Sequence, residues 1–468
     1  MTKLQLRGKD LIDIGFPEGR VIGVAINAMT KHHKRTSKYK ALEMLGEVLS
    51  DPERFAGDGI FGEVSELLLR QQKKAEPETP VLRQEPLPYV TFGESQIEKG
   101  AIEQMRTAMR LPITVAGALM PDAHEGYGLP IGGVLATDNA VIPYGVGMDI
   151  GCRMCLSVYE MPEGAFEKDR KHLLDLLKDY TRFGNEVFER PMDDEVLERD
   201  EFKLIPKAKE LRERARRQIG TSGSGNHFVE FGLVHLPEAA NPWSLPPGKY
   251  LGLLSHSGSR ALGAGLAQHY TKLAMSLCQL PPEARHLAWL DLDTEEGQEY
   301  WHAMNLAGDY ASACHHHIHR RMGKVLGMEP LARVENHHNF AWKEQLADGR
   351  EVVVHRKGAT PAAKGVLGII PGSMTSPAYI VAGRGGADSL NSASHGAGRL
   401  MSRRKAKASI DFGELKKHLK THGVDLIGGG LDEAPFAYKD IGQVMAAQSE
   451  LVDILGTFVP KVVRMDAE

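Results

Sequence analysis

Cysteine is scarce in this chain: of its 468 residues only Cys152, Cys155, Cys278 and Cys314 carry a thiol. Four cysteines are too few for a disulfide scaffold of this size, so a reducing compartment is expected. Apolar runs long enough to cross a membrane are missing, and the N-terminal stretch MTKLQLRGKDLIDIGF lacks the apolar core of a signal peptide. The sequence therefore predicts a cytoplasmic protein without a membrane span.

An excess of charge of one sign is also missing. Lysine and arginine number 57, aspartate and glutamate 61, and the formal net charge is −4. This balance gives no global attraction to nucleic acid, so local basic patches would have to hold a polyanionic partner. The segment KHHKRTSKYK at 31–40 is basic enough to contact RNA, and a solvated helix face is its simpler interpretation.

The common nucleotide-binding signatures are absent. No GxGxxG joins a strand to a helix, no GxxxxGK[ST] occurs, and no internal repeat is found. Residues 1–70 show mostly helical periodicity, and the Pro-rich, charged stretch KKAEPETPVLRQEPLPY that follows them is typical of a linker. We therefore expect a helical N-terminal extension with its linker at 1–88 and a second domain at 89–468.

The second domain mixes strands and helices. Short β-like runs alternate with Gly-rich turns, and helical periodicity is present at 161–181, 205–219, 260–279 and 295–325. A regular strand–helix–strand rhythm is missing, which favours an α+β fold over a doubly wound α/β fold. The chain also holds 50 glycines and 20 histidines, and many of both gather in short polar motifs. Such Gly-flanked loops often build sites for phosphate or metal.

One of these motifs is YGVGMDIGCRMC at 144–155, which places Asp149 and Cys152 three residues apart. A carboxylate and a thiolate at this spacing can share one metal ion, or the thiolate can bridge two. A buried cysteine beside a turn aspartate is the structural alternative. Cys152 and Cys155 also form C-x-x-C, but no second such pair exists, which argues against a zinc ribbon.

Histidine marks several other motifs. TSGSGNHFVEF contains His227 after a Gly/Ser loop, and LLSHSGSRALGAG contains His256 and Arg260 at an expected helix start, which suits a phosphate. ENHHNFAW, VHRKGATPAAKG and IIPGSM add further polar loops. HHHIH at 315–319 places two histidines at i,i+4, a spacing that fits a metal on a helix face and equally a solvated or capping role.

The stretch NSASHGAGRLMS at 391–402 sets His395 among serine, alanine and glycine. Small neighbours leave room for something bulky and anionic to approach the imidazole. Each motif taken alone has a structural explanation. Together, about seven Gly-punctuated motifs in one chain indicate a single metal-and-phosphate site assembled from loops.

Nine motifs, in this order, resemble those of the RtcB RNA ligases: PDAHEGYGLPIGG, GVGMDIGC, GSGNHFVE, HSGSRALG, HHNFA, HRKGAT, IPGSM, SHGAGR and DEAPFAYKD. The resemblance covers roughly residues 89–460. It implies an RtcB-like fold, with mixed β-sheets and flanking helices around a central metal and nucleotide cleft. It also implies a two-manganese, GTP-dependent ligase that joins RNA 3′-phosphate or 2′,3′-cyclic phosphate ends to 5′-hydroxyl ends.

The resemblance further implies roles for individual residues. Asp149, Cys152 and His227 would hold one Mn²⁺, and Cys152, His256 and His338 the other. His395 would attack the α-phosphorus of GTP and carry GMP. The positions implied to contact guanylate are Asn226, His227, Phe228, Val229, Glu230, His338, Asn339, Pro371, Gly372, Ser373, Met374, His395, Gly396, Ala397, Gly398 and Arg464.

Phosphates of RNA or GTP would be met by Arg260 and Arg399, and the RNA backbone by the basic segment 401–409. Four positions depart from the family's usual residues, namely Glu125 for Trp, Gly151 for Asn, Ala378 for Ser and Arg464 for Lys. All implied metal ligands and His395 are present. Metal binding and guanylylation are therefore expected.

Two alternatives use the same residues. A dinuclear-metal phosphoesterase or nuclease would use water as its nucleophile, and His395 would then bind a phosphate. A non-ligating RNA-end binding protein would keep GTP and RNA binding without turnover. Incubation with Mn²⁺ and α-labelled GTP separates the ligase from the first alternative, and an assay for the joining of RNA ends separates it from the second.

Overall fold

The computed structural model describes residues 4, 6–17, 20–73, 79–237 and 241–467. The chain divides into two compact units, Met1–Glu78 and Thr79–Glu468. The larger unit begins before residue 89 because Leu82 and Leu87, within the Pro-rich stretch, pack against its hydrophobic core. Among the described residues, no helix has both the length and the apolar character of a bilayer span.

The described part of the smaller unit contains four α-helices, namely α1 (Gly8–Ile12), α2 (Arg20–His32), α3 (Lys38–Ser50) and α4 (Gly62–Lys73). Apolar residues at helical spacing, such as Leu45 and Val48, form a core of its own. Ser37 caps α3 by accepting a hydrogen bond from the Lys40 amide at 3.3 Å. The basic segment 31–40 joins α2 to α3, and within it Tyr39 is 81% exposed.

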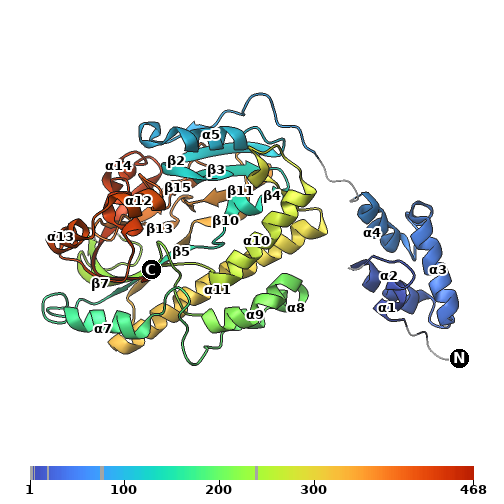
Figure 1. Cartoon of the computed structure of the whole chain (residues 1–468), viewed down its shortest axis with the longest axis horizontal. Helices are drawn as coiled ribbons and strands as arrows, with labels where there is room; N and C mark the ends of the chain where they lie inside the picture. Colours follow the sequence, from blue (N-terminus) through green and yellow to red (C-terminus); the bar gives the residue numbers. More distant parts are fainter. Residues whose placement is uncertain (1–3, 5, 18–19, 74–78, 238–240, 468) are drawn as a thin grey trace. The chain divides into compact units, whose positions relative to one another are not determined.

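Two main β-sheets form the larger unit (Figure 1). The first has the strand order β1 (Val90–Thr91), β2 (Thr114–Tyr127), β3 (Leu129–Thr137), β11 (Glu351–Lys357) and β10 (Asn339–Gln345). The second has the order β13 (Leu367–Ile370), β14 (Ala378–Gly383), β17 (Val452–Met465), β6 (Phe228–Leu236), β7 (Gly248–Ser257), β5 (Arg153–Tyr159) and β9 (Ala332–His337), and β16 (Asp425–Ile427) pairs with β17. Two small sheets pair β4 (Ala140–Val141) with β8 (Leu290–Asp291), and β12 (Ala359–Pro361) with β15 (Ser392–Ser394).

Helices flank these sheets, which confirms the predicted α+β fold. Their bounds are α5 (Lys99–Ala108), α6 (Pro143–Val146), α7 (Arg170–Tyr180), α8 (Glu201–Leu204), α9 (Pro206–Gln218), α10 (Arg260–Leu277), α11 (Glu295–Leu326), α12 (Arg403–Ser409), α13 (Phe412–His422) and α14 (Ile441–Ala446). Figure 1 shows α5 along the β2–β3 sheet and the long α11 beside α10, in agreement with their contacts. Short 3-10 turns lie at Pro52–Phe55, Glu94–Gln96, Glu195–Glu198, Arg285–Leu287, Leu431–Glu433 and Pro435–Ala437.

The helices expected at 205–219, 260–279 and 295–325 are confirmed as α9, α10 and α11. The helix expected at 161–181 is wrong in its first part, because α7 begins only at Arg170. Gly164 has a φ of +75°, a left-handed conformation that breaks a helix. Sequence periodicity therefore located this helix but not its start.

The larger sheet has two buried faces, as the alternation along β5 makes clear. Met154 and Leu156 enter one hydrophobic cluster, with residues such as Leu254 of β7. Tyr159 enters the opposite cluster, which includes residues of α7 and α11. Because successive strand residues point to opposite faces, neighbours in the sequence serve different sides of this sheet.

Candidate functional site

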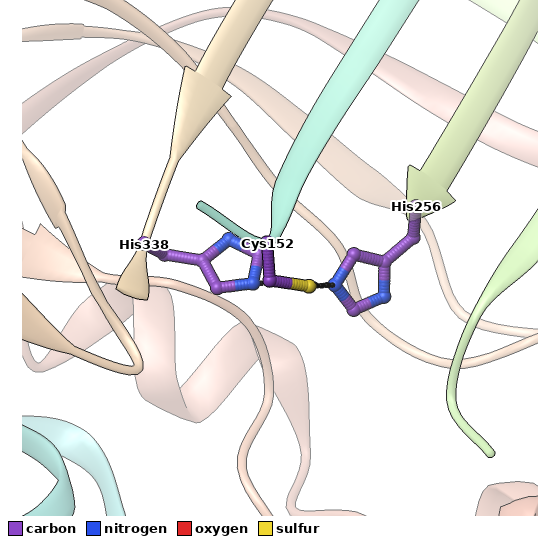
Figure 2. A group of neighbouring side chains, drawn as sticks. All are labelled: Cys152, His256 and His338. Carbon is purple, nitrogen blue, oxygen red and sulfur yellow. Dashed lines mark hydrogen bonds between the residues drawn. The ribbon is translucent and has the colours of Figure 1, made fainter. Parts of the chain in front are cut away.

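Three neighbouring strands bring Cys152, His256 and His338 together (Figure 2). His256 is the penultimate residue of β7, Cys152 directly precedes β5, and His338 directly follows β9. Their side chains point toward one another, with Cys152 Sγ 3.1 Å from His256 Nε2 and His256 Nε2 3.2 Å from His338 Nε2. All three residues are buried. Donor atoms from the three lie within 4.8 Å of one another, as ligands of one ion would.

A second group of potential ligands shares Cys152. Its sulfur lies 3.3 Å from His227 Nε2, which in turn lies 2.9 Å from Asp149 Oδ2. Donor atoms of Asp149, Cys152 and His227 again lie within 4.8 Å of one another. The structure therefore gathers all five residues that the resemblance implied as metal ligands, with the sulfur common to both groups.

The donor set fits transition-metal ions. Burial lowers the pKa of His256 well below its usual value, which keeps the imidazole neutral. Its Nδ1 lies 3.0 Å from the Asn226 carbonyl and must donate to it, so Nε2 presents a lone pair toward Cys152. Burial, and after it the charge of Asp149, raise the pKa of the Cys152 thiol well above its usual value. A nearby cation is therefore needed to keep this thiol deprotonated. Thiolate and imidazole ligands suit transition-metal ions far better than Mg²⁺.

The loop that carries Asp149 and Cys152 lies directly against α11. Gly151 has a φ of +71°, and a Cβ atom there would lie only 2.8 Å from Gly308 Cα. Asparagine tolerates this φ, but a side chain of any kind would collide with the helix backbone. The glycine at this position therefore follows from the close packing of α11.

His395 follows β15 and is held by Asp122 of β2. The imidazole Nδ1 lies 2.6 Å from Asp122 Oδ2, and the backbone amides of His395 and Gly396 donate to the same oxygen at 3.1 and 3.3 Å. Burial raises the pKa of the Asp122 carboxyl, but the nearby basic side chains and the hydrogen bond from His395 together outweigh burial and lower it overall. Because Nδ1 donates its proton to this carboxylate, Nε2 is left as the lone-pair nitrogen.

The Gly-rich loop after His395 packs tightly on β2. Gly398 has a φ of +73°, and a Cβ atom there would lie 2.1 Å from the Asp122 carbonyl oxygen. Glycine is required at this position for the approach of the two backbones. The same packing seats His395 against Asp122, with its ring centroid 5.0 Å from that of His338.

A cavity of about 480 Å³ connects His395 with Cys152, His256 and His338. Its lining includes most positions implied to contact guanylate, namely Asn226, Phe228, Glu230, His338, Asn339, Pro371, Gly372, Ser373, Met374, His395, Gly396, Ala397 and Gly398. Arg399 also lines it. Burial raises the pKa of the Glu230 carboxyl well above its usual value.

Three of the implied positions do not line this cavity: His227 lines a second, adjoining cavity, and Val229 and Arg464 point away from the first. Val229 points into the core beneath α7 and α11, because its neighbours Phe228 and Glu230 take the cavity face of β6. Arg464 points away from the cavity because alternate residues of β17 face opposite sides, and its neighbours Val463 and Met465 line the cavity instead. The Arg464 guanidinium donates to carbonyl oxygens at the end of α7, including that of Leu177 at 2.8 Å.

A second cavity of about 750 Å³ adjoins the first and shares Asp149 and Asn226 with it. Its lining also includes His227 and three arginines, Arg214, Arg260 and Arg464. Arg260 adopts a φ of +56°, unusual for a residue with a side chain, and its Nε donates to Thr221 Oγ1 at 3.1 Å. The second cavity thus places arginines, together with the acidic Glu186 and Asp466, next to the candidate ligands Asp149 and His227.

Sequence reasoning missed Asp122, although PDAHEGYGLPIGG contains it. It also gave no role to Lys357, which lines the first cavity and whose Nζ donates to the Tyr127 carbonyl at 2.6 Å. Burial lowers the pKa of Lys357 to about 7. The structure places the replacement Glu125 at the surface, where its amide donates to Glu98.

The loop after β13, which the resemblance implies to contact guanylate, keeps a hydroxyl despite its altered sequence. Ala378 lines the first cavity where a serine is usual, and Ser376, two residues earlier, lines it as well. Ser376 Oγ accepts a hydrogen bond from Ser373 Oγ at 3.0 Å, which ties the loop together. The segment 401–409 contributes Arg403, which lines the same cavity and pairs with Asp432 at 2.8 Å.

Comparison with known proteins agrees with this site. The family model described as "tRNA-splicing ligase RtcB" matches residues 104–466. The chain is 32% identical to the RNA-splicing ligase RtcB of Escherichia coli K12, over 77% of this chain and 93% of that protein. It is 32% identical to the tRNA-splicing ligase RtcB of Archaeoglobus fulgidus (73% and 86%) and to the RNA-splicing ligase RtcB of Mycobacterium tuberculosis (74% and 96%). With this coverage and this set of site residues, the chain belongs to the RtcB family.

Proposed function

We propose that this protein is a GTP- and Mn²⁺-dependent RNA ligase. It joins RNA ends that carry a 3′-phosphate or 2′,3′-cyclic phosphate to ends that carry a 5′-hydroxyl, in RNA repair or tRNA splicing. One observation carries the proposal: Asp122 fixes the Nδ1 side of His395, and the other nitrogen shares a cavity with two overlapping sets of metal ligands.

Water first opens a 2′,3′-cyclic phosphate end to a 3′-phosphate, and the chemistry then proceeds in three displacements at phosphorus. First, His395 Nε2 attacks the α-phosphorus of GTP, an N–P bond forms, and pyrophosphate leaves. Next, an oxygen of the RNA 3′-phosphate attacks the same phosphorus and frees the imidazole. Finally, the 5′-hydroxyl attacks the activated 3′-phosphate, GMP leaves, and a phosphodiester bond remains. Covalent catalysis divides one difficult step into easier ones.

Five residues would hold the two metal ions, one at Asp149, Cys152 and His227, the other at Cys152, His256 and His338. Two cations at this position supply charge neutralisation for the phosphates and fix their orientation. The chain's own groups complete the environment. Asp122 orients His395 and stabilises its positive charge when the N–P bond is present, and Lys357 adds an amine with a pKa of about 7 to the cavity wall.

The two adjoining cavities suit the two substrates. Guanylate fits the first, because Glu230 and the loop Pro371–Met374 offer hydrogen-bonding groups beside apolar side chains such as Phe228 and Val463. The RNA 3′-phosphate end fits the second, where Arg214 and Arg260 face Asp149 and His227. The shared residue Asn226 marks the place where the two phosphates would meet.

The proposal is tested by incubating the full-length protein with Mn²⁺ and GTP labelled at the α-phosphate. We expect label to remain on the denatured chain, to be released by acid and to resist alkali, as a phosphoramidate does. Labelled protein should then lose its label to RNA with a 3′-phosphate. No labelling with Mn²⁺ would favour a water-using phosphoesterase, and labelling without joined RNA would favour a non-ligating RNA-end binding protein.

Asp122→Asn is expected to slow label formation by roughly 10³-fold, because the orienting charge on Nδ1 is lost while the imidazole stays in place. Single-turnover labelling rates measure this change. Mn²⁺ content should stay at the parent value, since Asp122 belongs to neither ligand group. Glu125→Gln, an exposed change three residues along the same strand, is the control. A parental labelling rate in Asp122→Asn would contradict the proposed positioning role.

Glu230→Gln is expected to weaken GTP binding by about 10²-fold while ATP binding changes little. Guanine presents two neighbouring N–H donors on one edge, and both could bond to the buried Glu230 carboxylate. Adenine lacks this pair of donors. Calorimetric titration of GTP and ATP measures the selectivity. Val229→Ala alters the adjacent side chain on the core face and should lower stability without changing the GTP-to-ATP ratio. Equal loss of both nucleotides in Glu230→Gln would overturn the role of this carboxyl group.

A further inference from the structure

A third cluster of potential metal ligands lies on the opposite face of the larger sheet. Cys155 of β5, and His315 and His319 of α11, are buried with at most 1% of their surface exposed. One donor atom from each lies within 4.8 Å of the others. None of the three lines either cavity of the proposed active site. The cluster is therefore a separate feature of the sheet–helix interface.

The two histidines aim one nitrogen each at the same point. His315 Nδ1 lies 2.6 Å from Ser255 Oγ, and His319 Nε2 lies 2.8 Å from the same oxygen. Ser255 is the direct partner of Cys155 in the register of β7 and β5, so their side chains leave the sheet side by side. Two imidazole nitrogens, a thiol and a hydroxyl thus converge from one helix and two strands.

The outward nitrogens of both rings are held by the protein. His315 Nε2 lies 3.2 Å from the Ser257 carbonyl, an acceptor, so this nitrogen carries the proton and Nδ1 faces inward with its lone pair. His319 Nδ1 lies 2.7 Å from Ser157 Oγ. Metal-binding histidines usually have this arrangement, with the outer nitrogen bonded to a carbonyl or hydroxyl oxygen. Burial also lowers the pKa of His315 to about 4, so the ring is neutral, as a ligand must be.

We propose that Cys155, His315 and His319 bind a structural Zn²⁺ ion, with the Ser255 hydroxyl as a fourth, oxygen donor. Thiolate sulfur and imidazole nitrogen are the donors that zinc takes most often in proteins, and a fourth position filled by the protein marks a structural rather than a catalytic site. Binding releases the thiol proton of Cys155 to solvent. The ion would link α11 to β5 and β7. The zinc proposal does not depend on the proposed ligase activity.

Hydrogen bonds through the Ser255 hydroxyl alone would give the same side-chain positions without an ion, so zinc content has to be measured. The full-length protein is expressed in zinc-supplemented medium, purified without an immobilised metal, dialysed against EDTA and examined by mass spectrometry of the metals. The Cys152→Ser variant serves as background, because it removes the sulfur of the other two ligand groups. In this background we expect about one EDTA-resistant Zn²⁺ per chain.

Adding Cys155→Ser or His319→Gln to this background should remove the ion, whereas adding Cys314→Ser should leave it. Cys314 is a buried thiol on the same helix, next to His315, but belongs to no ligand group. Reloading with Co²⁺ gives a second measurement, since a thiolate–cobalt charge-transfer band should form in the background protein and vanish with Cys155→Ser. Circular dichroism confirms that each variant is folded.

Three results would overturn the assignment. The first would be a Cys152→Ser protein without EDTA-resistant zinc. The second would be an unchanged zinc content after the addition of Cys155→Ser. The third would be a loss of zinc with Cys314→Ser as large as the loss with Cys155→Ser. The first result needs no variant of the cluster, so the test stands even if Cys155→Ser fails to fold. GTP labelling of the parent protein is measured separately, so failure of the ligase proposal and failure of the zinc proposal are distinguished.

Discussion

Replacing His395 with alanine is expected to abolish covalent labelling by α-labelled GTP, a loss of at least about 10⁴-fold in rate. The imidazole is the attacking group in the proposed first step, and the Lys357 amine in the same cavity is held by the Tyr127 carbonyl oxygen. His338 has the closest ring in the cavity, but its Nε2 faces the sulfur and histidine of the metal cluster. Labelling rate and acid-labile phosphate per chain provide the measurement.

The loss in His395→Ala should be confined to this step. Because His395 belongs to neither ligand group, Mn²⁺ stoichiometry and thermal stability should stay near the parent values. RNA already carrying a 3′-terminal guanylate should still be joined, since the third displacement does not use the imidazole. His235→Ala, at an exposed histidine of β6, controls for loss of an imidazole elsewhere. If labelling persists in His395→Ala, another residue is the nucleophile.

Cys152→Ser is expected to empty both manganese positions, with stoichiometry falling from about two ions per chain to less than about 0.5. The sulfur lies 3.1 Å from His256 Nε2 and 3.3 Å from His227 Nε2, so one substitution removes a ligand from each group. A hydroxyl is a poor replacement, because it stays protonated and binds transition metals weakly. Titration of free Mn²⁺ by electron paramagnetic resonance measures the stoichiometry directly.

Cys314→Ser is the matched control for this substitution, since it removes another buried thiol and should leave both ions bound. His338→Gln offers a graded comparison, because His338 belongs to one ligand group only and should cost one ion. If Cys152→Ser and the parent bind Mn²⁺ equally, the shared-sulfur arrangement is wrong. Labelling by GTP should fall together with the second ion, which ties the metal positions to the proposed reaction.

The sequence allowed much of this site to be foreseen, because its chemistry is concentrated in short motifs. Asp149, Cys152, His227, His256 and His338 are rare donor types next to turns, and the structure gathers all five. Asp122 could not be given its role in the same way. It lies 273 positions before His395, and only the packing of β15 against β2 reveals that one carboxylate oxygen receives three donors.

Strand parity explains the positions that did not reach the cavity. A motif match assigns Val229 and Arg464 with their neighbours, but in a strand alternate residues face opposite sides. The predicted positions Phe228 and Glu230 line the cavity on β6, and Val463 and Met465 line it on β17 in place of Arg464. The register of the sheet decides which alternate residues of a strand face the cavity, and β17 shifts register between Pro460 and Val462. Such irregularities are set by long-range pairing and leave little trace in the local sequence.

The contact between Gly151 and Gly308 has a consequence for the order of folding. It joins backbone segments 157 positions apart, as the difference between 308 and 151 gives. Contacts over such long separations form late, after the entropy of closing the intervening loop has been lost. The loop bearing Asp149 and Cys152 therefore reaches its final position only when α11 has docked. During refolding, manganese binding by this protein should accordingly occur later than the formation of its secondary structure. The time course of manganese binding would then report the last stage of folding.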